Sequence, residues 1–164
     1  MTRVALCVAR FYGELADRLE SGARRALARA GITEADRFDV PGAFELPLSA
    51  SYAARSGRYD AVVCLGAVIR GETDHYDYVC GAVARGIQQV QLETLVPCGF
   101  GVLTVDTIEQ ALERVAGGSK RDTGAQAVEA VLASLAVEEQ LSLRPHGGRP
   151  SPPRRARRGP GSGA

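Results

Sequence analysis

The chain has 164 residues, of which 45% are hydrophobic and 24% charged, and its formal net charge at pH 7 is +1. This composition suits one folded domain with a sizeable core and excludes a fibrous or largely disordered chain. Six arginines and no acid lie in residues 144–164, which leaves 14 basic and 19 acidic residues elsewhere, so the expected folded part is acidic and unsuited to binding nucleic acid.

Strand and helix patterns alternate along the chain. The predicted strands are short apolar runs rich in β-branched residues, and the predicted helices carry apolar residues three and four positions apart. In chain order they are strand 3–9, helix 14–30, strand 38–40, a helix that follows the 41–47 loop and reaches about residue 55, strand 60–69, helix 76–92, strand 99–104, a helix capped by Asp106 or Thr107 and including Val115, and helix 125–140. This alternation predicts an α/β fold: a three-layer α/β/α sandwich with a four-stranded parallel sheet, flavodoxin-like.

Glycine and proline positions support these boundaries. Gly31 follows the first helix, and glycine is common just beyond a helix end. Pro47 fits the first turn of the second helix, where a missing N–H does no harm. The glycine-rich segment 117–124 separates the last two helices.

From residue 144 the sequence consists mostly of Arg, Pro, Gly and Ser and contains no large apolar residue. Such a segment cannot bury a core. We expect one domain over residues 1–143 and a disordered tail over residues 144–164. The tail is either functionally silent or binds nucleic acid or another polyanion weakly.

The cysteines, Cys7, Cys64, Cys80 and Cys98, lie far apart and mostly within apolar runs. This spacing is neither that of a zinc site nor that of a secreted disulfide scaffold, so we expect free thiols in a reducing compartment. A strand begins almost at Met1, and no apolar run approaches the roughly 20 residues that span a bilayer. These features favour a cytoplasmic protein with no membrane partner.

Ligands of parallel sheets bind beyond the carboxyl ends of the strands, and four segments are expected to meet there. Phe11 offers an aromatic face, Glu45 a carboxylate and His75 a proton carrier near neutral pH. The backbone of residues 71–73 can hold an anion at the start of a helix. Residues 100–104 complete the group, which suits a polar, partly aromatic substrate and a phosphate.

Several candidate residues, including Phe44 and an arginine in the fourth helix pattern, Arg114, also have a purely structural interpretation. His75 could cap a helix at the surface, Phe11 and Phe44 could be core or edge residues, and Arg114 could be a solvated helix residue. Glu45 is harder to explain in this way, because a carboxylate close to a core needs partners.

Other catalytic motifs are missing from the sequence. It contains no P-loop, dinucleotide-binding glycine motif, His-Glu-x-x-His or paired Cys-x-x-Cys, and the second histidine, His146, lies in the predicted tail. We therefore expect no metal and no other cofactor.

Four motifs, in order and spacing across roughly residues 3–136, resemble those of the 6,7-dimethyl-8-ribityllumazine synthase family. They are 41–47 (PGAFELP), 66–79 (GAVIRGETDHYDYV), 100–104 (FGVLT) and 108–114 (IEQALER). The resemblance implies condensation of 5-amino-6-(D-ribitylamino)uracil with 3,4-dihydroxy-2-butanone 4-phosphate, with loss of phosphate and water, in riboflavin biosynthesis. This chemistry needs proton transfer and stabilisation of the departing anion but no metal or redox group.

The resemblance also implies roles for individual residues. His75 would move protons, while the backbone of Glu72 and Thr73, together with Arg114, would bind phosphate. The residues implied to hold the ribitylaminouracil are Phe11, Ala43, Phe44, Glu45, Ala67, Val68, Ile69 and Phe100. In this family the site lies between neighbouring subunits of a pentamer, so Phe100 and Arg114 would come from the adjoining chain.

Two departures from the family pattern affect these expectations. Members commonly read Gly-Asn-Lys-Gly before the last helix, with the lysine near the phosphate, whereas here residues 121–124 read RDTG in a longer loop. Either Lys120 or Arg121 substitutes, or phosphate affinity is lower. An N-terminal strand that matters in sixty-subunit members is also missing, so a pentamer or decamer is favoured over a 60-mer. The alternative function is a lumazine- or flavin-binding carrier, or an assembly protein, on the same scaffold.

Overall fold

The computed structural model describes residues 1–141, so the predicted tail, residues 144–164, lies wholly outside the described residues. The described chain alternates strands and helices as predicted. Its elements are β1 (Arg3–Ala9), α1 (Gly13–Arg29), β2 (Glu34–Val40), the 3-10 turn η1 (Ala43–Glu45), α2 (Leu46–Arg55), β3 (Ala61–Ile69), α3 (His75–Thr94), β4 (Cys98–Val105), α4 (Ile108–Leu112) and α5 (Thr123–Gln140).

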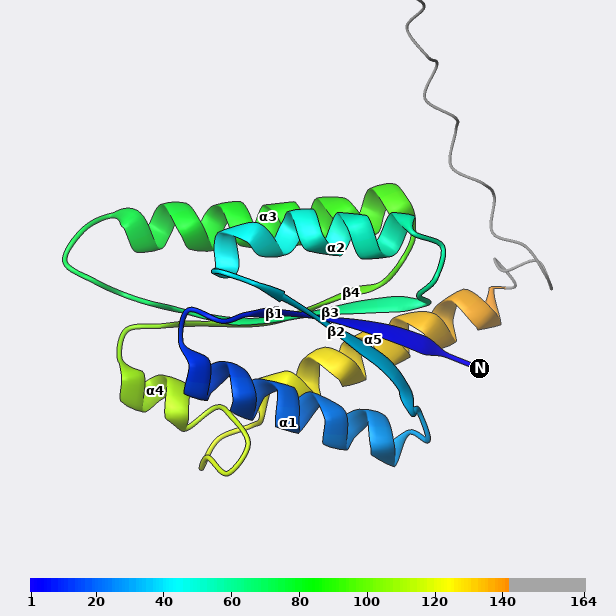
Figure 1. Ribbon diagram of the computed structural model, residues 1–164, viewed down its shortest axis with the longest axis horizontal. Helices are drawn as coiled ribbons and strands as arrows, with labels where there is room; N and C mark the ends of the chain where they lie inside the picture. The colour runs from blue at the N-terminus through cyan, green and yellow to red at the C-terminus, as the bar shows by residue number, and fades with distance from the viewer. Residues whose placement is uncertain (142–164) are drawn as a thin grey trace, which may run out of the picture.

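The four strands form one sheet in the order β2-β1-β3-β4, and every neighbouring pair is parallel. Helices α2 and α3 cover one face of this sheet, while α1, α4 and α5 lie on the other (Figure 1). The predicted three-layer α/β/α sandwich with a four-stranded parallel sheet is therefore confirmed.

Burial explains why the two central strands are the most apolar parts of the sequence. Residues Val4 to Ala9 of β1 and Ala61 to Leu65 of β3 are all buried, because helices cover both faces of the sheet. Alternate residues belong to different cores: Leu6 and Val63 pack with α1 and α5, whereas Cys7 packs with α2 and α3. The continuous apolar runs thus serve two cores at once.

The edge strand β2 is longer than predicted. It spans Glu34–Val40 and pairs along its whole length with β1, whereas the sequence predicted only residues 38–40. Most of its side chains are exposed, and charged residues dominate its first half. Because β2, within the described residues, pairs with a neighbouring strand only on its β1 side and exposes most of its side chains, it lacks the run of apolar residues from which a strand is predicted.

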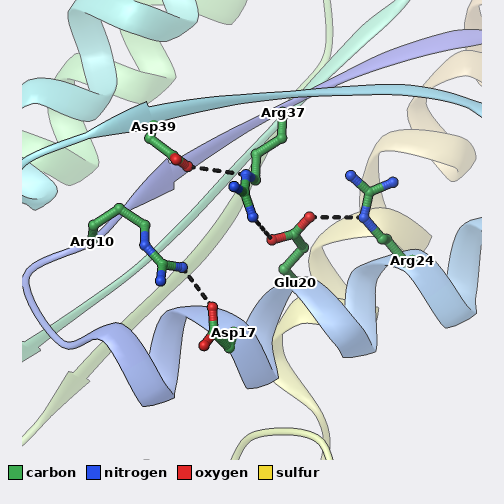
Figure 2. Close-up of polar contacts among 6 residues, drawn as sticks. All are labelled: Arg10, Asp17, Glu20, Arg24, Arg37 and Asp39. Carbon is green, nitrogen blue, oxygen red and sulfur yellow. Dashed lines mark hydrogen bonds and ion pairs between the residues drawn. The ribbon is translucent and has the colours of Figure 1, made fainter.

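Ion pairs join this edge strand to α1 (Figure 2). The buried carboxylate of Glu20 accepts hydrogen bonds from Arg24 Nε at 2.8 Å and from Arg37 Nη1 of β2 at 3.1 Å. Arg37 Nε also lies 3.2 Å from Asp39 Oδ1. Charge pairing therefore takes over part of the role that apolar packing has in the central strands.

The helix predicted to include Val115 is shorter than expected. α4 ends at Leu112, and a turn follows in which the N–H of Lys120 donates to the Glu113 carbonyl at 2.7 Å and the N–H of Thr123 donates to the Arg114 carbonyl at 2.9 Å. These returning bonds occupy carbonyls that a longer helix would use itself. Pro47 lies in the first turn of α2, as predicted.

The four cysteines are free thiols, as predicted: Cys7, Cys64 and Cys98 are buried and Cys80 is half-buried. Burial raises the pKa of Cys98 to about 12, so its thiol is protonated at neutral pH. Within residues 1–141, no helix has both the length and the apolar character needed to cross a membrane.

Candidate active site

The loops after β1, β2 and β3 lie at the carboxyl edge of the sheet, where the sequence placed the site (Figure 1). Backbone hydrogen bonds join these strand ends in pairs. The N–H of Arg10 donates to the Val40 carbonyl and that of Arg70 to the Val105 carbonyl, both at 2.9 Å. The start of the loop after β1 is therefore fixed to the end of β2, and the start of the loop after β3 to the end of β4.

Two aromatic rings lie exposed on this edge. Phe11 is 75% exposed and makes a T-shaped contact with Tyr12, with ring centroids 4.9 Å apart, and Phe44 is 64% exposed on η1. Neither ring belongs to the core, so both have free faces on which a planar ligand can stack. Ala43, by contrast, is buried and supports the turn.

Glu45 is exposed at the end of η1, directly before α2. The expectation that this carboxylate lies close to a core is therefore wrong. The 3-10 turn buries Ala43 and turns Glu45 towards solvent, which leaves its oxygens accessible to hydroxyl or amine donors of a ligand.

The end of β3 presents free backbone as well as side chains. Its pairing with β1 stops at Leu65, opposite Val8, whereas its pairing with β4 continues to Ile69. Beyond Leu65, the edge of β3 that faces β1 has no ladder partner among residues 1–141, and this stretch includes Ala67, Val68 and Ile69. Its N–H and C=O groups can pair with the amide groups of a pyrimidine ring.

His75 is the first residue of α3, and its side chain is exposed beside the loop that carries Glu72 and Thr73. The interpretation of His75 as a helix cap is wrong, because the cap position belongs to Asp74. Asp74 makes no side-chain capping bond, and the hydrogen bond that the N–H of His75 donates to Thr73 Oγ1 is long, at 3.4 Å. The start of the helix thus keeps N–H groups available for an anion.

Sequence reasoning gave no role to Arg70, yet its side chain makes several contacts here. Its Nε donates to Asp106 Oδ1 at 2.8 Å, its Nη2 lies 3.6 Å from Asp77 Oδ1, and its guanidinium lies 4.2 Å from the centroid of the Tyr76 ring. Burial and the neighbouring Cys80 raise the pKa of Tyr76, so the ring under the guanidinium is a neutral phenol. The sequence gives no local signal for these contacts, because Asp106 lies far from Arg70 along the chain.

Phe100 does not join the other site residues within one chain. It is the third residue of β4, 42% exposed, and pairs with Cys64, five residues before the end of β3 at Ile69. Five residues of strand span about 16 Å. The expectation that residues 100–104 meet the other three segments is therefore wrong for Phe100, although Thr104 pairs with Val68 near the strand end.

Arg114 also lies away from the α3 start. It follows α4, on the sheet face opposite α3, and its Nη1 donates to the Gln110 carbonyl at 2.8 Å and lies 3.3 Å from Glu113 Oε2 (Figure 1). The interpretation of Arg114 as a solvated helix residue is only partly right, because the residue is half-buried and lies just past the helix. One chain does not bring it to His75.

Two open hollows on the surface lie elsewhere. One of about 630 Å³ lies over the outer face of α3 and one of about 460 Å³ over that of α1. Neither contains a predicted site residue. Among residues 1–141, no three His, Cys, Asp or Glu side chains form a group able to hold a metal ion.

Comparison with known proteins matches the sequence of this chain to one family. The family model described as 6,7-dimethyl-8-ribityllumazine synthase matches residues 1–139. Proteins named 6,7-dimethyl-8-ribityllumazine synthase are similar to the chain: that of Kineococcus radiotolerans is 51% identical over 146 residues, covering 88% of this chain and 90% of that protein. That of Desulfosudis oleivorans is 57% identical over 112 residues (67% and 71%), and that of Streptomyces coelicolor is 50% identical over 141 residues (85% and 87%). The chain therefore belongs to the 6,7-dimethyl-8-ribityllumazine synthase family.

Proposed function

We propose that this protein is a transferase that makes 6,7-dimethyl-8-ribityllumazine for riboflavin biosynthesis. It condenses 5-amino-6-(D-ribitylamino)uracil with 3,4-dihydroxy-2-butanone 4-phosphate, and phosphate and water leave. The observation that carries the proposal is the family match over residues 1–139, together with a histidine at the start of α3 beside an anion-binding backbone. Membership of the family supports the reaction, and the positions and exposure of the site residues support the roles assigned to them.

The ribitylaminouracil binds at the carboxyl edge of β1, β2 and β3. Its ring stacks on Phe11 and pairs with the free backbone edge over residues 67–69. Phe44 and Ala43 shape the wall beside it, and Glu45 accepts hydrogen bonds from the ribityl hydroxyls. The exposure of Phe11, Phe44 and Glu45 supports these roles, since all three can reach a ligand without any change in the core.

His75 carries the protons of the reaction. The 5-amino group attacks the ketone carbon of the second substrate, and water leaves as the imine forms. Phosphate then departs by elimination and leaves an enol, which tautomerises to a ketone. The second amine attacks this carbonyl and closes the ring as a second water leaves. Each step moves a proton near neutral pH, for which an imidazole is suited. The N–H groups of Glu72 and Thr73 and the start of α3 stabilise the departing phosphate.

The site is completed by an adjoining subunit. Phe100 and Arg114 lie away from the His75 region of their own chain, and a neighbouring copy supplies them in a pentamer or in a decamer built from two pentamers. Small molecules and further copies of this chain are thus its partners. Residues 1–143 form the catalytic domain, and the cytoplasm is its location.

Lys120 takes the place of the family's phosphate-binding lysine. Arg121 Nη2 lies 3.4 Å from Glu129 Oε2 and so faces α5. The backbone of Lys120 is instead bound to the Glu113 carbonyl, next to Arg114, and its ammonium can act beside that guanidinium. The longer loop keeps a cation at the phosphate.

Arg114→Ala tests the assigned phosphate site. Removing the guanidinium should raise the KM of the butanone phosphate by about 10-fold or more, because a charge-assisted bond to phosphate contributes roughly 1.5–3 kcal/mol. The KM of the ribitylaminouracil should change little, and Arg121→Ala serves as the matched control with near-normal kinetics. An unchanged KM for the phosphate substrate in Arg114→Ala would refute the role.

A further inference from the structure

The loop that should bind phosphate has little internal structure of its own. Residues 71–74 lie between β3 and α3 and are exposed, and a Cβ added at Gly71 would meet nothing within 4 Å. The bond from the His75 N–H to Thr73 Oγ1 is long, at 3.4 Å. The shape of this loop therefore depends on how its two ends are held.

Arg70 holds both ends. Its backbone N–H donates to the Val105 carbonyl at 2.9 Å, which fixes the end of β3 on β4. Its side chain crosses to the first turn of α3, where the guanidinium lies 4.2 Å from the Tyr76 ring centroid and Nη2 lies 3.6 Å from Asp77 Oδ1. Arg70 thus connects the end of β3 to the first turn of α3, the helix that begins with His75.

A third contact orients the guanidinium. Nε donates to Asp106 Oδ1 at 2.8 Å, and the N–H of Asp106 itself donates to Gln110 Oε1 at 2.8 Å. Arg70 is therefore held from the β4–α4 side while it stacks on the α3 side. A planar guanidinium can lie flat on a ring while the N–H groups along its edge donate to carboxylates, whereas an ammonium has neither the plane nor the fork of donors.

We propose that Arg70 is a positioning residue that fixes the anion-binding loop and His75 for the reaction. This inference rests on the proposed function for its catalytic consequence, but the contacts themselves do not. The side chains of Arg70, Asp77 and Asp106 are 45%, 62% and 61% exposed. Exposed pairs contribute little to global stability, so the effect of losing them should be local.

Arg70→Ala is the direct test. The thermal midpoint should stay near that of the unmutated protein, while amide hydrogen exchange becomes faster over residues 71–77. Because small displacements of reacting groups are costly, kcat should fall about 10- to 100-fold and the KM of the phosphate substrate should rise. The KM of the ribitylaminouracil should be almost unchanged. Arg70→Lys, which keeps the charge and loses the plane, should lie closer to Arg70→Ala than to the unmutated protein.

A matched control is Arg55→Ala. Arg55 Nη2 lies 3.1 Å from Glu93 Oε2, an exposed contact between α2 and α3 that is also distant in sequence. It should leave kcat and exchange over residues 71–77 unchanged. Asp106→Asn should lower kcat on its own but should lower it little further in the Arg70→Ala background, because both changes disrupt the same contact between Arg70 and Asp106.

Unchanged exchange over residues 71–77 in Arg70→Ala, or kcat within about twofold of the unmutated value, would overturn the inference. Absence of turnover in the unmutated protein would instead refute the proposed function. The positioning role is then decided by hydrogen exchange alone, since that measurement needs no reaction.

Discussion

Glu20 is the residue whose replacement should most clearly separate charge pairing from apolar packing in this fold. It is 9% exposed on α1, and its two carboxylate oxygens accept from Arg24 and Arg37 at 2.8 Å and 3.1 Å (Figure 2). Glu20→Gln keeps the shape of the side chain but removes its charge. It also replaces one acceptor by an NH₂ group that points at an arginine.

The expected magnitude follows from these contacts. Hydrogen bonds to charged groups contribute about 1.5–3 kcal/mol to stability. The two partner side chains, Arg24 and Arg37, are 46% and 44% exposed, so solvent screens part of the interaction. We expect Glu20→Gln to lower the free energy of unfolding by about 1–2 kcal/mol, and Tm by about 2–4 °C for each kcal/mol in a chain of this length.

Thermal unfolding followed by circular dichroism at one fixed protein concentration measures the change, since assembly makes Tm depend on concentration. Glu14→Gln is the matched control in the same helix: Glu14 pairs with Arg18 at 3.0 Å, but its side chain is 73% exposed. The control should shift stability by less than about 0.5 kcal/mol. Equal shifts in the two variants would show that burial of Glu20 adds nothing and would refute the reasoning.

Two further predictions concern packing and pH. A Cβ in Gly124→Ala would press on the Leu19 carbonyl, so the free energy of unfolding measured in urea should fall by about 1–3 kcal/mol. In the control Gly13→Ala the nearest contact of the new Cβ is 3.8 Å away, so this variant should lose no stability. Equal stability of the two variants would contradict the close approach of α1 and α5. Burial raises the pKa of Cys98 from 9.0 to about 12, so the thiol stays protonated in the folded state while the unfolded chain ionises above pH 9. Stability should therefore fall as pH rises from 9 towards 12, and Cys98→Ala should flatten the fall in urea midpoints; an equal fall in this variant would contradict the assignment.

The strands that could be predicted from the sequence are those whose two faces are covered. β1 and β3 show continuous apolar runs because helices bury both sides, and their predicted bounds agree with the observed ones within one residue. β2 lies at the sheet edge with charged, exposed side chains, and only residues 38–40 gave a signal. The end of α4 depends on returning hydrogen bonds from the 117–124 loop, which no local pattern reveals.

The candidate site divides in the same way. Phe11, Phe44 and the 72–75 loop follow strand ends directly, so the rule for parallel sheets places them on one edge. The place of Phe100 depends on the register of β4 against β3, and that of Arg114 on where α4 ends, and neither can be predicted from local patterns. Arg70 lay inside the motif, but its role depends on residues that become neighbours only after folding.

Turnover by the purified full-length chain tests the central claim most directly. Both substrates are incubated with protein, and lumazine absorbance and released phosphate are followed together, with a sample lacking protein as the blank. We predict that lumazine and phosphate appear in equal amounts well above the blank, and that His75→Ala slows both by about 10²- to 10⁴-fold, the usual contribution of a general acid–base. Binding of the ribitylaminouracil without formation of either product would contradict the account and identify the protein as a carrier.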